Sequence, residues 1–263
     1  MTSDKMKEIL AKLVDTSNII VLWMYFMDLE KIYLQGVEAF QKQPPAFNDA
    51  FIFFEQAATQ GHSKSQYNLG QMFYKGVGTK QDLDAAFYWH EQSAKNGIDA
   101  GMYETGYEYG NRGDATNALK WLTKSANSGN ILAQSFLGHL YGGFVTSPFN
   151  VKQDFNKSAH FLEGAAKSGD AKSQFRYSAL LLDGKGTPKN EAMALHYSKL
   201  AADNNYPDAL YTTALMYFNG FGTEKNHDLA LYYAEKAMKK GDSEASKLVK
   251  HIKSKKKKLF GLF

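Results

Sequence analysis

The histidines are the side chains of this sequence best suited to metal or acid–base chemistry. A zinc-binding helix pairs two histidines at H-x-x-x-H spacing, so that both rings share one face. No such pair occurs among the seven: His62, His90, His139, His160, His196, His227 and His251. Cysteine is absent, which excludes thiolate metal sites and cysteine nucleophiles. No Ser/His/Asp arrangement or carboxylate pair stands out either. We therefore expect no catalytic residue, no metal and no cofactor, and predict that the protein is not an enzyme.

Glycine-rich turns are a second feature that can carry chemistry, because such loops can hold phosphates. They read Gly76-Val77-Gly78, Gly184-Lys185-Gly186 and Gly220-Phe221-Gly222. A phosphate loop needs Gly-Lys-Ser/Thr before a helix, and a dinucleotide fingerprint needs a preceding strand. Neither context is present. We interpret these glycines as turn residues, because a positive φ costs glycine little.

The elements that hold these turns repeat along the chain. A turn-forming residue closes an alanine-rich segment at intervals of roughly 36 residues: Gly61, Gly97, Gly129, Gly169, Asn205 and Gly241. Eight positions before each mark lies an aromatic residue: Phe53, Trp89, Trp121, Phe161, Tyr197 and Tyr233. Small residues stand four and eleven positions before each mark, and these offsets share one face of an α-helix. The Gly or Asn at the mark suits a left-handed helix C-cap.

A second segment follows each mark and carries its own small-residue column. That column consists of Gly70, Gly106, Gly138, Ser178 and Ala214. A large residue follows three positions later: Phe73, Tyr109, Tyr141, Leu181 and Tyr217. Each copy is therefore predicted to be a first helix, a turn and a second helix.

This pattern resembles the Sel1-like repeat, a relative of the tetratricopeptide repeat. The match is carried by Tyr67-Asn68-Leu69-Gly70 and residues 75–78, then by Asp82, Ala86, Trp89, Ala94 and Gly97. The resemblance implies an all-α fold, a right-handed α-solenoid of antiparallel helix pairs with helical caps at both ends. Two copies depart from it. The second has Gly110-Asn111-Arg112-Gly113 in place of the G-x-G turn, and the third carries extra residues at 144–151, which either contact a partner or form a tolerated loop.

We divide the chain into three parts: a helical N-terminal cap at 1–45, the repeat solenoid at 46–242 and a capping helix with a tail at 243–263. The solenoid has about five full copies after a leading half copy. Helices are expected at 5–13 and 18–41. The apolar run Ile19–Met27 is too short for a membrane helix, which needs roughly 20 residues, and is expected to be buried in the cap. The N-terminus lacks a secretory pattern, so we expect a cytoplasmic protein.

The formal net charge of +4 comes from the tail, since residues 243–263 carry seven lysines and one glutamate. A basic cluster before apolar residues can adhere to anionic lipid, which makes the tail a possible membrane contact: Lys255, Lys256, Lys257, Lys258, Leu259, Phe260 and Phe263. The favoured alternative is a solvated tail whose apolar end folds back on the last helix. No basic stripe runs along the repeats, so nucleic acid is not an expected partner.

The resemblance places the first helix of each copy on a concave, partner-binding face. The residues expected there form an aromatic-rich track: Tyr67, Gln71, Tyr74, Tyr103, Tyr107, His139, Phe175, Leu182, Tyr211, Leu215 and Phe218. Aromatic residues of this kind are frequent at interface hot spots. The resemblance also offers a packing role for Tyr67, Tyr103, Phe175 and Tyr211, because their column is often aromatic in Sel1-like repeats.

The function expected from the resemblance is a non-catalytic, bacterial scaffold or adapter that binds another protein through this face. No small-molecule substrate is expected. Two alternatives stay open. The first is an immunity protein that neutralises a cognate toxin, and the second is a peripheral membrane adapter recruited through the basic and apolar tail.

Overall fold

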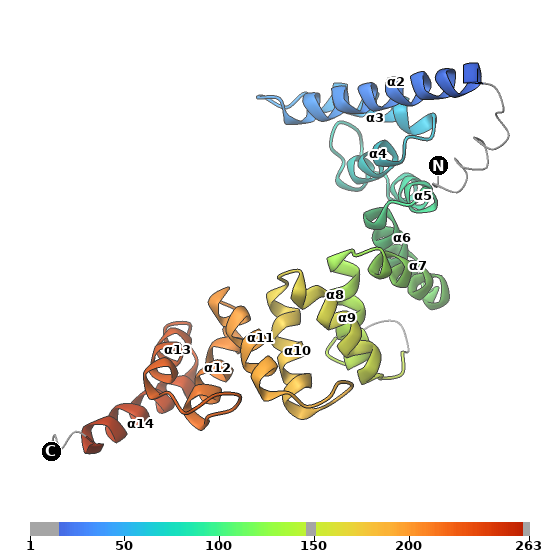
Figure 1. Ribbon diagram of the computed structural model, residues 1–263. Coiled ribbons are helices and arrows are strands. Elements are labelled where there is room, and N and C mark those ends of the chain that lie inside the picture. Colours follow the sequence, from blue (N-terminus) through green and yellow to red (C-terminus); the bar gives the residue numbers. More distant parts are fainter. Residues whose placement is uncertain (1–15, 146–150, 260–263) are drawn as a thin grey trace. The chain divides into compact units, whose positions relative to one another are not determined.

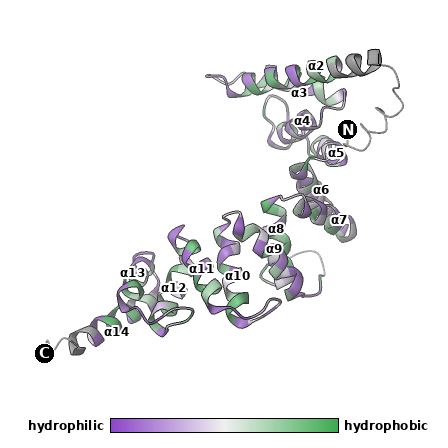
Figure 2. Ribbon diagram, viewed as in Figure 1, coloured by the Kyte–Doolittle hydropathy of each residue, from purple (hydrophilic) through white to green (hydrophobic). Residues whose placement is uncertain are grey.

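The computed structural model describes residues 16–145 and 151–259, and the side chains of residues 24–145 and 151–255. Within these ranges every regular element is a helix (Figure 1), which confirms the predicted all-α fold of packed helix pairs. Hydrophobic and hydrophilic residues alternate along the helices (Figure 2), as expected of elements with one buried face. The predicted helix at 5–13 and most of the extra residues at 144–151 lie outside the described residues.

The chain forms two compact units, residues 1–130 and 131–263. The first unit holds α2 (Thr16–Gln41), α3 (Phe47–Thr59), α4 (Ser63–Lys75), α5 (Leu83–Lys95), α6 (Asp99–Asn111) and α7 (Ala115–Asn127). The second unit holds α8 (Ile131–Gly142), α9 (Phe155–Lys167), α10 (Ala171–Asp183), α11 (Glu191–Asp203), α12 (Pro207–Asn219), α13 (His227–Lys239) and α14 (Ser243–Leu259). Within each unit every helix packs on the next one along the chain.

The polar and glycine residues of the repeat set where each helix begins and ends. The side chain of Asp82 accepts hydrogen bonds from the N–H groups of Asp84 and Ala85, at 3.0 and 2.9 Å, and so caps α5. Equivalent caps begin the later second helices: Asp114, Asp154, Asn190 and Asn226. The residues at the predicted marks have positive φ, from 91° to 96° at the glycines and 58° at Asn205. The left-handed helix ends predicted from the repeat are therefore present.

Each copy fits a small residue on its first helix to one side chain on its second. A Cβ built on Gly70 would lie 2.4 Å from the Cδ2 atom of His90. Glycine faces a large partner in the same way in three other copies: Gly36 and Phe54, Gly106 and Leu122, Gly138 and Leu162. The two remaining copies have Ser178 and Ala214 in this column, and small residues, Ser198 and Ala234, at the partner position. A large side chain on the second helix thus occurs where the first helix has glycine, and a small one where the first helix has serine or alanine.

The N-terminal cap differs from the prediction in its first part. Met24, Tyr25 and Met27 are exposed, so the expectation that the whole of Ile19–Met27 is buried is wrong for these residues. The helix α2 has 26 residues whereas its neighbour α3 has 13. Among the described side chains of α2, Leu29 is the first that is fully buried, and Phe26 is half-buried. No helix in the described part of the chain is both long and apolar enough to span a membrane.

The C-terminal cap agrees with the prediction where side chains are described. The helix α14 packs on α13, and its apolar face is buried through Ala245, Leu248, Val249 and Ile252. These residues complete the hydrophobic core of the second unit. Of the predicted membrane-contact residues, the side chains of residues 256–259 and all of residues 260–263 lie outside what is described.

Candidate functional site

In the first unit, five of the predicted binding residues come from two helices. Tyr67, Gln71 and Tyr74 lie on α4, and Tyr103 and Tyr107 lie on α6. Tyr74 is 52% exposed and Tyr107 is 44% exposed, while the other three are half-buried. The rings of Tyr103 and Tyr107 are stacked, with 6.3 Å between their centroids. Tyr74 and Tyr107 are thus the more exposed of the five, although the ring of Tyr107 also contacts that of Tyr103.

A carboxylate that sequence reasoning did not single out lies among these residues. The Nε2 atom of Gln71 donates hydrogen bonds to Glu104 Oε1, at 2.9 Å, and to Tyr67 Oη, at 3.3 Å. These bonds join the first helices of two successive copies. Burial raises the pKa of the Glu104 carboxyl above its ordinary value, although the bond from Gln71 and the charge of Lys75 act in the opposite direction.

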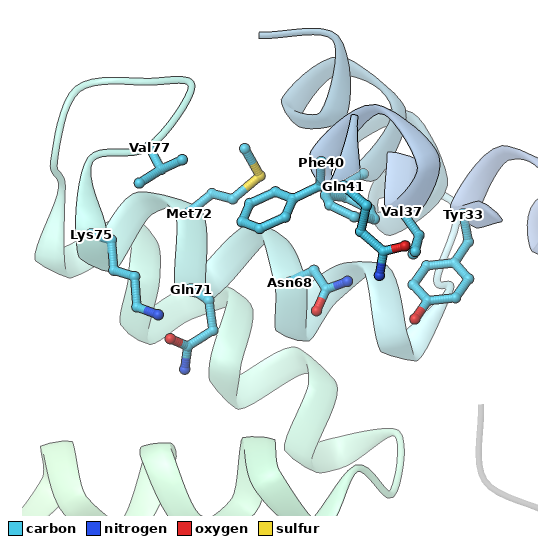
Figure 3. Close-up of a pocket in the computed structure, with 10 residues that line it drawn as sticks. Tyr33, Val37, Phe40, Gln41, Asn68, Gln71, Met72, Lys75 and Val77 are labelled. Carbon is cyan, nitrogen blue, oxygen red and sulfur yellow. The ribbon is translucent and has the colours of Figure 1, made fainter. Parts of the chain in front are cut away.

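A pocket of about 280 Å³ opens between α2, α3 and α4 (Figure 3); we call it the α2–α4 pocket. Its apolar wall includes Val37, Phe40 and Met72, and Figure 3 shows the ring of Phe40 pointing toward the Met72 side chain. Gln71 and Lys75 belong to its polar edge. An apolar wall with a few polar groups is the usual composition of a binding pocket.

A second pocket, of about 270 Å³, lies between α4, α5 and α6; we call it the α4–α6 pocket. Aromatic rings and two carboxylates line it, among them Tyr74, Phe87, Tyr103, Tyr107, Glu104 and Glu108. Gln71 lines the first pocket and bonds to Glu104 in the second. The two pockets are therefore neighbours on one surface of the first unit, separated by this hydrogen bond.

His90 also lines the α4–α6 pocket, at 5% exposure, and its Nε2 atom has no hydrogen-bond partner. Burial lowers the pKa of His90 to about 4, with the carboxylate of Glu108 acting weakly in the other direction. The ring is therefore neutral at pH 7. Among the described residues no group of three or more histidine, aspartate or glutamate side chains is arranged to hold a metal ion.

In the second unit most of the predicted binding residues take part in packing. All five apolar ones are half-buried and lie against the hydrophobic core of the unit: Phe175, Leu182, Tyr211, Leu215 and Phe218. The ring of Phe218 contacts α14, since its centroid lies 5.5 Å from that of His251 and 5.0 Å from Nζ of Lys255. Lys255, predicted as a membrane contact, thus covers an aromatic ring of the protein itself.

His139 is the predicted binding residue that the structure places in the interior. It is 2% exposed, its Nδ1–H donates to the carbonyl oxygen of Ser135 at 2.6 Å, and burial lowers its pKa. Its ring also meets that of Phe144, at 6.3 Å between centroids. His139 is therefore a core residue, and the prediction that it lies on the binding face is corrected.

The residues missed from the sequence have one identifiable signal. Glu104 and Glu108 are four residues apart on α6, which places both on the helix face that carries Tyr103 and Tyr107. At the position of Glu104 the other copies have Leu34, Asn68, Phe136, Arg176 and Thr212. A carboxylate at a position without a preferred residue type indicates a feature particular to this copy.

Comparison with known proteins gives a consistent family match. The model of the Sel1 repeat matches six consecutive segments: 32–62, 63–98, 99–130, 131–170, 171–206 and 207–242. The family model therefore counts residues 32–62 as a full repeat, whereas the residue columns define this leading copy only in part. Each of the last five segments contains two successive helices, and the first contains the end of α2 together with α3.

Individual relatives share parts of their length with the chain. DAP3-binding cell death enhancer 1 of Rattus norvegicus is 32% identical over 168 residues, which cover 61% of this chain and 32% of the relative. A protein of Neisseria meningitidis serogroup B is 26% identical over 168 residues, 62% of this chain and 34% of that protein. The chain therefore spans about a third of the length of these relatives. A Sel1 repeat protein from Oxalobacter formigenes superposes with a TM-score of 0.65 at 21% identity, covering 83% of this chain and 86% of that one.

Proposed function

The chain belongs to the Sel1 repeat family, and from this we propose that it is a non-catalytic scaffold that binds a partner protein through the α4 and α6 surface of its first unit. Sel1 repeat proteins generally mediate protein–protein interactions. Stacked helix pairs suit this role because they present a long surface built from equivalent positions of successive copies.

The observation that carries the proposal is the contrast between the two units. In the first unit Tyr74 and Tyr107 are exposed beside two neighbouring pockets. In the second unit the equivalent track consists of half-buried residues such as Phe175 and Phe218 that pack on the core. Exposed tyrosines beside apolar pockets are the residues from which interface hot spots are built, because a rigid ring enters a pocket at little entropic cost.

The test is affinity purification of partners on the full chain, followed by mass spectrometry, with the variant Tyr74→Ala/Tyr107→Ala. A matched control is Tyr88→Ala/Tyr232→Ala, since both control tyrosines are 52% exposed but lie on the second helices α5 and α13. We expect the first variant to lose a partner that the wild type and the control retain. Retention of every partner by both variants would show that the binding surface lies elsewhere.

A further inference from the structure

We propose that the α4–α6 pocket receives a basic side chain, lysine or arginine, of the bound protein, between the Glu104 carboxylate and the rings of Tyr74, Tyr103 and Tyr107. This inference rests on the proposed function, because it names the chemistry that the partner must present to the same surface. Four observations support it: a carboxylate with no ion pair among the described residues, aromatic rings around that carboxylate, room for one long side chain, and related cation sites elsewhere in the chain.

The carboxylate of Glu104 is only partly compensated. It is half-buried, and it accepts a hydrogen bond from the neutral amide of Gln71. Within the described ranges no lysine, arginine or histidine nitrogen lies within 4.0 Å of it, and the positive charge that acts on it through space is that of Lys75. A buried charge that lacks a close counter-ion is unfavourable. A cation supplied by a partner would remove that penalty.

Aromatic rings surround this carboxylate on the pocket wall. Tyr103 and Tyr107 are stacked next to it in sequence and in space, and Tyr74 reaches the pocket from α4. The face of such a ring attracts a cation, and the attraction is larger for guanidinium and ammonium groups that leave water. The ring surfaces also suit the apolar stem of a lysine or arginine.

The pocket has the size of one long side chain. Its volume of about 270 Å³ corresponds to roughly nine water molecules at about 30 Å³ each. His90, which lines the pocket, adds no opposing positive charge at neutral pH, because burial holds its pKa near 4.

The chain itself shows how this fold holds a cation. Arg112 contacts two residues that line the pocket: its Cζ lies 4.5 Å from the centroid of Phe87, and its guanidinium donates hydrogen bonds to Glu108, at 2.9 Å, and to Asp84, at 2.7 Å. The guanidinium of Arg112 is thus bound by a carboxylate, Glu108, and by an aromatic ring, Phe87. Glu108 forms an ion pair with Arg112, whereas Glu104 forms no ion pair within the part of the chain that the structure describes.

The second unit gives a further example at the position equivalent to Glu104. Arg176 occupies it, and its Cζ lies 5.0 and 5.4 Å from the centroids of Phe144 and Phe175. A guanidinium between two rings is therefore compatible with the backbone at this point of the repeat. In the first unit the charge at this position is reversed, so the cation has to come from outside.

The direct test uses a pair of small probes with the full chain. N-acetyl-arginine amide carries the guanidinium, and N-acetyl-citrulline amide is a neutral analogue of nearly the same shape. Binding is followed by amide NMR shifts during titration. We expect saturable shifts centred on residues 103–108 with the arginine probe, and at least tenfold weaker binding of the citrulline probe.

Two variants complete the test. Glu104→Gln keeps the shape of the side chain and removes its charge, and we expect it to weaken binding of the arginine probe at least tenfold, because the charge pair is lost. Glu55→Gln removes an exposed charge on α3 of the same unit and should leave binding unchanged. The proposal fails if the two probes bind equally, if neither binds, if the shifts centre elsewhere, or if Glu104→Gln has no effect.

The same variants separate this proposal from the one on which it rests. If Tyr74→Ala/Tyr107→Ala loses the captured partner while Glu104→Gln retains it at full affinity, the surface is correct and the basic side chain is not. If both variants retain the partner, the surface assignment itself is overturned. Loss of the partner in both, together with the arginine-probe result, supports both proposals.

Discussion

Gln71 and Glu104 connect the first helices of two successive copies, α4 and α6, through a hydrogen bond of 2.9 Å. The bond forms the boundary between the α2–α4 pocket and the α4–α6 pocket. It also keeps a half-buried carboxylate supplied with a donor, so a local contact in the repeat array holds the shape of the candidate binding surface.

Replacing Gln71 by alanine should destabilise the first unit. The change removes the donor from Glu104 and from Tyr67, and a hydrogen bond to a charged group contributes about 1.5–3 kcal/mol. A double-mutant cycle with Glu104→Ala, measured by urea unfolding at pH 7, should give a coupling free energy of about 1–2 kcal/mol. Additive single-mutant effects would mean that the hydrogen bond contributes nothing to stability.

Replacing Gly70 by alanine should destabilise the protein by about 1–3 kcal/mol, the usual cost of overpacking. All three of the closest atoms that the new Cβ would meet belong to the buried His90 ring. In a His90→Ala background the same change should be neutral or stabilising, because alanine favours a helix over glycine by about 1 kcal/mol. That double variant reproduces the Ala214 and Ala234 pair of the last copy.

The measurement for this pair is chemical unfolding of the two single variants and the double variant. Gly70→Ala should have opposite or strongly unequal effects in the two backgrounds. An equal loss of stability in both would show that the space beside Gly70 is not set by His90.

Stability should decrease as the pH falls because of His90. Its pKa is about 4 in the folded protein against an ordinary value of 6.5, so the unfolded chain binds the proton more tightly. The contribution is complete above pH 6.5 and is lost progressively between pH 6.5 and 4, by up to about 3 kcal/mol. His90→Ala should flatten this part of the pH profile. His160→Ala, whose side chain is exposed on α9, should retain the slope of the wild type.

Ile252→Ala should destabilise the second unit by about 2–5 kcal/mol, as deletion of a fully buried aliphatic side chain usually does. Ile252 is buried in the core although it lies on the last helix, α14. The neighbouring Lys250→Ala, on the exposed side of that helix, should change the free energy of unfolding by less than about 0.5 kcal/mol. Similar effects of the two variants would mean that α14 does not act as a cap.

The regular part of this fold could be predicted from residue spacing. Small and aromatic columns define helix faces, and the marks at Gly61 through Gly241 indicate left-handed helix ends, because only some residue types tolerate that conformation. These are local properties, repeated in every copy. The same reasoning placed Tyr74 and Tyr107 on a surface where the structure leaves them exposed.

The irregular part depends on contacts that spacing does not encode. His139 is buried partly because Phe144, in the residues peculiar to the third copy, packs against its ring. Glu104 is part of the candidate site because Gln71, on another helix, donates a hydrogen bond to it and because tyrosine rings of α4 and α6 line the same pocket. Such features require the three-dimensional arrangement of the copies.

The sizes of the facing residues on the two helices of each copy also determine which helices can pair correctly. If the second helix of the copy with Leu122 paired with the first helix that carries Ala214, the two side chains would overlap; Ser198 opposite Gly70 would leave a void. Repeat proteins with similar copies are prone to misassembly, and such mismatches penalise wrong pairings. We therefore expect duplication or loss of a whole copy to be tolerated far better than a crossover between the two helices of one copy.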